Sequence, residues 1–431
     1  MEAALRAAVL SAGAKVLESL LAGVGRGRRD DPVFCACGTR MESRGVEEKT
    51  ILTILGPVRF TRSRFQCPEC RQARYPGDEA LDVTETTRSP GVRRMVARAG
   101  SRQTFKEAKE DLRVYAAIEV SAKDVERGAE KTGREVEAWQ ARERAALLSG
   151  ESDSLPPKTI PVMYIEMDGT GVPMVPSEVA GRKGKQPDGS ARTREAKIGC
   201  VFTQTTTDEK GRPVRDPDST TFVGAIETAD EFGRRIEAEA IRRGLSQAWK
   251  VVVLGDGAVW IRTQAELRFL GAILIVDLFH AREHVAELAR LLFFGQEREI
   301  QKHRLRWWTD LDQGQVEKII REARARLSQG GDQRKKAEQE IGYLEQNVDR
   351  MRYDRYRKQG LFVGSGGGRG GMQKRHRGQA QTVGHGVVPG WSQRHHRPPL
   401  QHPLRTIRGL LGRTSRLKTR IQDAGPVVVR L

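Results

Sequence analysis

The sequence predicts an α/β protein in which a sheet with helices follows a cysteine-containing module and a helical segment. Two apolar segments, 161–168 and 250–256, read as buried strands that each run into an aspartate, Asp168 and Asp256. Strand and helix patterns alternate around them, and two cysteine pairs flank a β-type stretch near the N-terminus. A carboxylate at the end of an apolar strand is costly to bury without a cation or donor nearby. The two aspartates are therefore candidate site residues.

Length and composition indicate a soluble protein of two or three domains. The chain has 431 residues, 38% of them hydrophobic, and no apolar run approaches a membrane span, so no membrane partner is expected. Glu2 stands where a signal peptide needs positive charge, which predicts a cytoplasmic protein. Five cysteines, an odd number, fit a reducing compartment and metal binding better than disulfides.

The positive charge is unevenly distributed. The net charge is +19, which favours a polyanionic partner. Residues 367–431 hold 13 Lys and Arg and one acid, Asp423, so they contribute +12 and leave +7 on the other 366 residues. Only part of the total therefore indicates a DNA-binding surface.

Residues 1–30 are predicted to form an N-terminal helix and residues 31–89 a zinc-ribbon-like module. The alternating stretch 50–65 predicts a β-hairpin that turns at Gly56-Pro57. Four thiolates close a tetrahedral zinc site and stabilise a module too small for its own core. The candidate zinc ligands are Cys35, Cys37, Cys67 and Cys70. The first pair is one residue shorter than usual, so a degenerate site with spare thiols is the alternative; Cys200 is predicted to be a core residue.

Residues 90–150 are predicted to be a helical, helix-turn-helix-like DNA-binding region. Ser101–Thr104 can cap a helix that ends near Val114, and Ser121 can cap a second short helix after a tight turn. The candidate DNA-binding residues on that second helix are Lys123, Arg127, Lys131 and Arg134. An ordinary helical hairpin with a solvated face is the alternative. The polar, proline-containing stretch 149–157 predicts a linker.

Residues 158–280 alternate in a specific order. Strands are predicted at 160–167, 196–205, 219–226, 250–255 and 271–276, and helices at 229–243 and 258–268. This β-β-β-α-β-α-β order matches the ribonuclease H-like fold, whose catalytic carboxylates come from the end of the first strand and from just after the fourth. Asp168 and Asp256 fall at those two places. Carboxylates at one rim of a sheet are typical of divalent-metal sites for phosphoryl transfer.

Residues 281–360 are predicted to be an all-helical insertion. Apolar residues keep helical spacing over 316–327 and 341–348. Trp307 and Trp308 lie within it; core packing is the default interpretation, and stacking on DNA bases is the alternative.

Several motifs together resemble a known family. They are 168–174 (DGTGVPM), 194–203 (REAKIGCVFT), 253–260 (VLGDGAVW), 275–282 (IVDLFHAR) and 350–366, with the cysteine ribbon before them. Over roughly residues 30–366 the chain resembles the DDE transposases of bacterial insertion sequences in the ISKra-type group, which are related to Mutator-like transposases.

The resemblance implies specific roles and partners. Asp168 and Asp256 would be the first two ligands of Mg²⁺ (or Mn²⁺), and Asp277 and His280 match an acidic-x-x-His motif. His280 would contact the scissile phosphate or orient Asp277; a histidine hydrogen-bonded at a helix start is the alternative. The implied partners are double-stranded DNA, as element terminal inverted repeats and target, and further copies of the chain in a homo-oligomer. The implied location is the bacterial nucleoid.

The third catalytic carboxylate of the family is missing. A Glu is expected just past Gly366, in a segment resembling Glu-Ala-Gly-Cys-Lys, but residues 367–374 read GGRGGMQK. Codons for Arg369–Lys374, read one base later, permit Glu-Ala-Gly-Cys-Lys. We therefore interpret 361–431 as the end of the catalytic domain followed by a frameshifted, aberrant basic tail. A genuine tail that binds nucleic acid electrostatically is the alternative, in which case a third ligand would be sought among Glu338, Glu340 and Glu345.

The functional prediction is a DNA transposase that catalyses metal-dependent strand cleavage and strand transfer, impaired here by loss of the third carboxylate. One alternative is a catalytically inactive DNA-binding derivative that recognises element ends. Another is a structure-specific nuclease, which shares the fold and cuts without joining.

Overall fold

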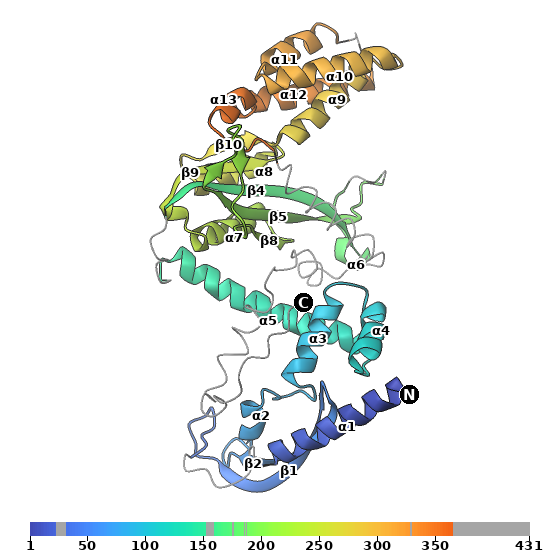
Figure 1. Cartoon of the computed structure of the whole chain (residues 1–431), viewed down its shortest axis with the longest axis vertical. Helices are drawn as coiled ribbons and strands as arrows, with labels where there is room; N and C mark the ends of the chain where they lie inside the picture. The colour runs from blue at the N-terminus through green and yellow to red at the C-terminus, as the bar shows by residue number, and fades with distance from the viewer. Residues whose placement is uncertain are drawn as a thin grey trace. The chain divides into compact units, whose positions relative to one another are not determined.

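The computed structural model describes residues 1–22, 32–151, 159–174, 176–184, 186, 188–327 and 330–364. These residues divide into two compact units, an N-terminal unit (1–136) and a C-terminal unit (137–364). Both contain helices and strands, as the α/β prediction requires (Figure 1). None of the helices in the described ranges combines the length and apolar character that a bilayer crossing requires.

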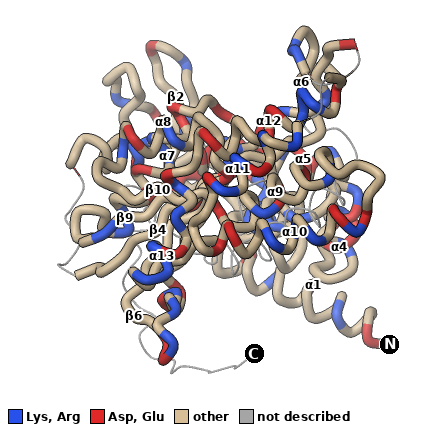
Figure 2. The backbone as a smooth tube through the Cα atoms, turned by 90° about the horizontal axis from the view of Figure 1, so that it is seen from above, with Lys and Arg blue, Asp and Glu red and all other residues tan. Residues whose placement is uncertain are grey.

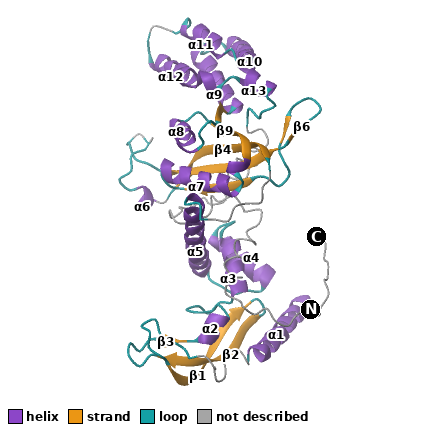
Figure 3. Cartoon of the chain, turned by 90° about the vertical axis from the view of Figure 1, so that its left-hand side faces the viewer, coloured by secondary structure: helices purple, strands orange, loops and turns teal. Residues whose placement is uncertain are grey.

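The N-terminal unit is built on one long hairpin (Figure 3). Its elements are α1 (Glu2–Leu21), β1 (Glu42–Thr53), β2 (Gly56–Gln66), β3 (Ala73–Arg74), α2 (Pro76–Ala80), α3 (Pro90–Gly100), α4 (Phe105–Ala116) and the first half of α5 (Ala122–Leu148). Ala14 and Leu21 of α1 pack against Ile51, Val58 and Phe60 of the hairpin. The unit thus places a three-stranded sheet, in the order β1-β2-β3, beside a group of helices.

The predicted hairpin is present, but the predicted turn position is wrong. Thr53 pairs with Gly56, so Ile54 and Leu55 make the turn and Pro57 already lies in β2. The Thr53 hydroxyl accepts a hydrogen bond from Leu55 N (3.1 Å) and donates one to Gly56 O (2.8 Å). These bonds stabilise the turn two residues earlier than the Gly-Pro pair suggests.

The second helix of the predicted helix-turn-helix is not short. Thr104 caps α4 in a capping box with Glu107, and Ser121 caps α5 by accepting from Asp124 N (3.1 Å), as expected. However, α5 continues for 27 residues. Gly128, an apparent weak point, lies where a Cβ would be only 2.7 Å from Val96, so it permits close packing on α3 instead of ending the helix.

The C-terminal unit contains one five-stranded sheet. Its strands are β4 (Ile160–Pro173), β5 (Thr193–Gln204), β8 (Thr221–Ala225), β9 (Ala248–Gly255) and β10 (Ile273–Val276). The spatial order is β10-β9-β4-β5-β8, or fifth, fourth, first, second, third in chain order. β4 runs antiparallel to β5 and parallel to β9; β5 pairs antiparallel with β8, and β9 pairs parallel with β10. Each predicted strand and helix of 158–280 is present, with shifted ends.

Helices cover both faces of this sheet. The helices of the unit are α6 (Pro176–Val179), α7 (Ala229–Arg242), α8 (Val259–Arg268), α9 (Leu278–Leu292), α10 (Glu297–Asp312), α11 (Val316–Arg324), α12 (Asp332–Asn347) and α13 (Tyr353–Lys358), with 3₁₀ turns at Leu245–Gln247 and Val348–Arg350. α7 and α8 pack on one face through Phe232, Ile236 and Ile261. A small ribbon of β6 (Thr206–Thr207) and β7 (Pro213–Val214), which the sequence did not predict, follows β5.

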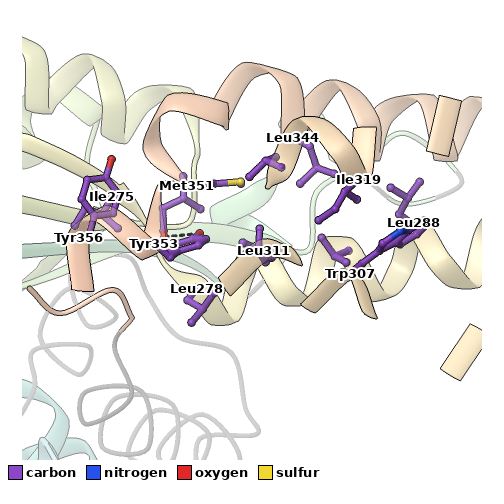
Figure 4. Packing of buried hydrophobic residues seen from close by; sticks show 14 of the residues in the cluster. Ile275, Leu278, Leu288, Trp307, Leu311, Ile319, Leu344, Met351, Tyr353 and Tyr356 are labelled. Carbon is purple, nitrogen blue, oxygen red and sulfur yellow. Dashed lines mark hydrogen bonds between the residues drawn. The ribbon is translucent and has the colours of Figure 1, made fainter. Parts of the chain in front are cut away.

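The helices after β10 share a continuous core with the other sheet face. Trp307, Leu311, Ile319 and Leu344 point toward one another between the helices (Figure 4). Tyr353 joins this cluster to the sheet, because its hydroxyl donates to Val276 O (2.9 Å) at the end of β10. The helical region is therefore anchored directly to the strand end near the two aspartates.

Candidate functional site

The four predicted zinc ligands lie together at one end of the hairpin. Sγ–Sγ distances are 3.3 Å for Cys35–Cys70, 3.6 Å for Cys37–Cys67 and 3.9 Å for Cys37–Cys70. Zn–S bonds of about 2.3 Å in a tetrahedron separate sulfurs by about 3.8 Å, so this arrangement fits a zinc ion. All four are free thiols and lie within 4.8 Å of one another. The cluster could hold zinc, which agrees with the predicted ligand set.

Tight backbone turns allow both cysteines of the first pair, Cys35 and Cys37, to face the cluster although only one residue separates them. Cys35 N donates to Thr39 O (2.9 Å), and Gly38 takes a left-handed φ of 87° within that turn. Cys67 N likewise donates to Gln72 O (2.9 Å). Gly38 therefore supplies the backbone freedom that a one-residue spacer demands.

The thiols of the cluster differ in acidity. Bonds to Thr39, with smaller contributions from Cys35 and Cys67, lower the pKa of Cys37 to about 6. The Gln72 backbone N–H lowers the pKa of Cys70, but the neighbouring Cys35 thiol, burial and the other cysteines outweigh it and raise that pKa to about 12. Zinc is bound by the thiolate form of each of these cysteines.

Asp168 lies within a strand, not at its end. β4 continues to Pro173, and Asp168 pairs with Ile198 of β5. The prediction that the strand stops at this aspartate is therefore wrong. However, the sheet does change near this aspartate. The pairing of β4 with β9 ends at Glu166, and residues 168–173 pair with β5 alone. Asp168 is thus partly exposed at the point where the five-stranded sheet narrows to a ribbon.

Asp256 lies next to Asp168 in strand register. Glu166 pairs with Leu254, so two further residues along each parallel strand lead to Asp168 and Asp256. A Cβ on Gly255 would be 3.5 Å from Met167 O, which shows that the chains still run side by side there. Neighbouring strands lie about 4.8 Å apart, and side chains two residues apart share a face. Both carboxylates therefore come from the same end of adjacent strands, on the sheet face covered by the later helices.

Asp256 is held in place by a residue far along the chain. Its Oδ1 accepts from Ala258 N (2.9 Å), and its backbone O accepts from the Tyr343 hydroxyl (2.7 Å). Burial, and then the charge of Asp256, raise the pKa of Tyr343 above its ordinary value. Tyr343 therefore stays a neutral donor that fixes the Asp256-Gly257 turn.

One of the three alternative glutamates connects to this aspartate. Glu340 bonds His284 Nδ1 (2.6 Å), and the His284 ring stacks on Tyr343 with centroids 3.7 Å apart. Glu338 instead pairs with Arg334 and Glu345 with Arg324. Glu340 is therefore connected to Asp256 only indirectly, through the side chains of His284 and Tyr343.

Asp277 and His280 stand at the start of α9. Asp277 N donates to Gly255 O (2.7 Å), and the Asp277 carboxylate caps the helix by accepting from Phe279 N (2.8 Å). His280 Nδ1 is 3.3 Å from Glu283, and its buried Nε2 has no hydrogen-bond partner among the residues described. The structure therefore joins the α9 start to the β9 end, one residue before Asp256.

Among the described residues, no third side chain completes a compact site around the two aspartates. The cysteine cluster is the only group of three or more His, Cys, Asp or Glu there whose ligand atoms all lie within 4.8 Å. The position at which the family's third Glu is expected falls after residue 364, outside the described residues. That Asp168 and Asp256 hold a divalent cation therefore stays a prediction.

Sequence reasoning missed Glu166, which lies on the same sheet face as Asp168. It is 5% exposed, lies 3.6 Å from Arg215 and accepts a bond from the Cys200 thiol (3.1 Å). The alternation Tyr164, Glu166, Asp168 was the available signal. The prediction that Cys200 is a core residue is confirmed.

The predicted DNA-binding residues share one exposed face of α5, opposite the buried Val125 and Ala129. They are Lys123, Arg127, Lys131 and Arg134. Lys123 pairs with Glu126 (2.9 Å) and Arg134 with Glu130 (3.6 Å). Trp307 is fully buried and Trp308 is partly buried with its Nε1 bonded to Arg282 O, which confirms the core-packing interpretation.

Comparison with known proteins gives a remote likeness among solved structures only. Neither family models nor curated proteins match the chain. Among solved structures, the Drosophila P element transposase strand transfer complex is similar, with a TM-score of 0.30 and 10% identity. The alignment covers 71% of this chain and 90% of that one. A likeness at this level does not by itself define a fold or a function.

Proposed function

We propose that the C-terminal unit is a ribonuclease H-like phosphoryl-transfer domain and that the chain is a DDE-type DNA transposase of the ISKra-type group. The observation that carries this is the pair Asp168 and Asp256, at matching register on adjacent parallel strands of a sheet ordered third, second, first, fourth, fifth. That strand order and those two carboxylate positions are the ones expected of this fold.

In this proposal Asp168 and Asp256 hold Mg²⁺, and the zinc cluster stabilises the hairpin module. The bound Mg²⁺ would supply Lewis acidity for in-line displacement at a DNA phosphate. Tyr343 keeps the Asp256 turn in one conformation, and the Asp277 carboxylate accepts a hydrogen bond from the His280 backbone N–H (3.3 Å). The partners would be element ends and target DNA, bound in the bacterial nucleoid by a multimer of the chain.

A second candidate function is a DNA-binding derivative without catalysis. It is favoured by the residues GGRGGMQK at 367–374, where the family's glutamate is expected. Such a chain would occupy element ends and compete with an intact transposase.

One experiment separates the two. The nucleotide sequence across codons 360–412 is read first; if the +1 frame encodes Glu-Ala-Gly-Cys-Lys and stays open, a frame-corrected chain is prepared. We expect the chain with its own basic tail to bind duplexes made from DNA flanking its gene without cutting them. The frame-corrected chain should cleave and join them with Mg²⁺, and Asp168→Asn should lower that rate by about 100-fold or more.

The matched control is Asp218→Asn, an exposed aspartate at φ 53°, a conformation that asparagine tolerates. Equal rates for the Asp168→Asn and unmodified frame-corrected chains would overturn the assignment. Cleavage without joining would instead indicate a nuclease.

A further inference from the structure

A cavity of about 670 Å³ in the C-terminal unit is lined mainly by charged side chains. It lies between the last half of α5, the start of α7 and the segment 182–197. Its cations are Arg144, Arg182, Lys183, Arg194, Lys197 and Arg235, and its anions are Glu137, Glu195, Glu227 and Glu231. The cations outnumber the anions by two, and this excess positive charge lies on one wall of the cavity.

On one wall every carboxylate is already engaged. Arg235, whose side chain is 7% exposed, bonds Glu227 (2.7 Å) and Glu137 (2.9 Å). Lys197 bonds Glu195 (2.7 Å), and Glu231 closes the capping box of α7 with Thr228. Arg144 also bonds Glu137 (3.1 Å), so this wall has three cations and four carboxylates, and its charged side chains are held by one another.

The other wall carries cations that outnumber their counter-charges. Among the described residues, Arg182, Lys183 and Arg194 form no salt bridge, and the carboxylate whose charge acts on Arg194 is Glu178 of α6. Both basic (blue) and acidic (red) residues lie around α6 in Figure 2, just before this segment. Burial, and then the neighbouring charge of Arg182, lower the pKa of Arg194, and the charge of Glu178 opposes this shift. An anion placed between the two guanidinium groups would relieve their mutual repulsion.

The backbone presents these cations in a defined geometry. Lys183 bridges Ser190 in antiparallel fashion, and Ala191 N donates to Arg182 O (3.1 Å). Arg194 itself lies in β5, paired with Val172 of β4. The three side chains therefore project from a hydrogen-bonded hairpin and a sheet strand.

We propose that this cavity binds the phosphate backbone of DNA, away from Asp168 and Asp256. Lys197 pairs with Gly169, next to Asp168 in sequence, and Arg194 pairs with Val172. At about 3.3 Å per residue, Arg194 is about 13 Å along the ribbon from Asp168, and the Lys197 side chain lies on the α7 side of the sheet. The inference rests on the proposed function only for the choice of DNA as the polyanion.

The test measures DNA affinity as a function of salt. The full chain and its R182Q/R194Q variant bind a fluorescent duplex of about 30 base pairs in EDTA at several KCl concentrations. Removing two phosphate contacts should lower the slope of log K against log [KCl] by about 2, at about 0.9 per contact. Lys183→Gln alone should lower it by about 1. Contributions from the rest of the chain, including residues 367–431, cancel between variants.

The matched control is R192Q/R212Q. Both arginines are exposed, lie outside the cavity lining and make no ion pair within the described residues, so the same charge is removed. R192Q/R212Q should change the slope of log K against log [KCl] by well under half as much as R182Q/R194Q does. Equal slopes for the two double variants would overturn the proposal.

The binding test does not depend on catalysis, because EDTA removes the divalent metal that catalysis needs. A chain that binds DNA in this test but never joins DNA with Mg²⁺ therefore counts against the proposed function alone. A chain that joins DNA while R182Q/R194Q keeps the unmodified slope counts against the cavity alone.

Discussion

The turn after β9 illustrates how single residues position the candidate site. Gly257 has φ +88°, and a Cβ there would lie 2.8 Å from the Tyr343 hydroxyl, which itself bonds Asp256 O. An alanine at this position would be strained in the backbone and would also displace Tyr343. The turn that carries Asp256 is therefore specified by a glycine and a tyrosine that lie on different elements.

We expect Gly257→Ala to destabilise the chain more than Gly271→Ala. Gly271 has φ +75°, but a Cβ there would meet no atom within 4 Å, so its variant reports the backbone strain alone, about 1 kcal/mol. Gly257→Ala should lose a further 1–3 kcal/mol, roughly the cost of overpacking. Urea unfolding measures both, and equal losses would mean that Tyr343 does not pack against this turn.

At the scale of elements, the hairpin module depends on its cysteines. We expect about one zinc per chain in the unmodified protein and almost none in Cys37→Ser, with a lower melting temperature for the N-terminal unit. Cys200→Ser is the control, because Cys200 lies in the sheet of the other unit. Metal analysis after dialysis gives the answer; full zinc content in Cys37→Ser would remove this cysteine from the site.

The start of α5 should make stability depend on pH. The Ser121 hydroxyl, followed by Arg88, lowers the pKa of Asp124 from 3.8 to about 2. A carboxyl group with a depressed folded-state pKa stabilises the fold above its unfolded pKa, and this stabilisation is lost as pH falls toward the folded value. Asp124→Asn should therefore lower the melting temperature between pH 5 and 7, and the difference should shrink from about pH 4 to about pH 2.

The exposed Glu48→Gln is the control for that series, since Glu48 makes no ion pair among the described residues. A difference between Asp124→Asn and the unmodified chain that persists undiminished at about pH 2 would contradict the ionic origin of the effect.

Elements also show what the sequence could predict. Apolar runs located every strand of the five-stranded sheet, because burial on both faces leaves a strong pattern. They did not locate the ends of β4, since residues 169–173 are polar or glycine-rich and pair only with β5. The length of α5 was not predicted; the contact that lets Gly128 lie within it, on Val96 of α3, joins residues far apart in sequence. Local sequence carries no information on such long-range contacts.

At the scale of the whole molecule, topology brings the two aspartates together. Asp168 and Asp256 are far apart in sequence but lie in β4 and just after β9, which are adjacent parallel strands, and Tyr343 comes from a helix 87 residues after Asp256. The chain order of the strands and helices was predictable from the sequence, and the carboxylate pair stays a prediction. The contact from Tyr343 was not predictable, because no pattern in α12 distinguishes that tyrosine from a core residue.

The most direct test of the central claim is a titration of the full chain with Mn²⁺, monitored by electron paramagnetic resonance. The cysteines are first saturated with zinc, so that they do not bind Mn²⁺. If Asp168 and Asp256 form a divalent-metal site, Asp168→Asn and Asp256→Asn should each weaken one Mn²⁺ site by about tenfold or more. Asp218→Asn should bind like the unmodified chain, and the tail histidines contribute equally to all variants. Unchanged Mn²⁺ binding in both aspartate variants would contradict the account.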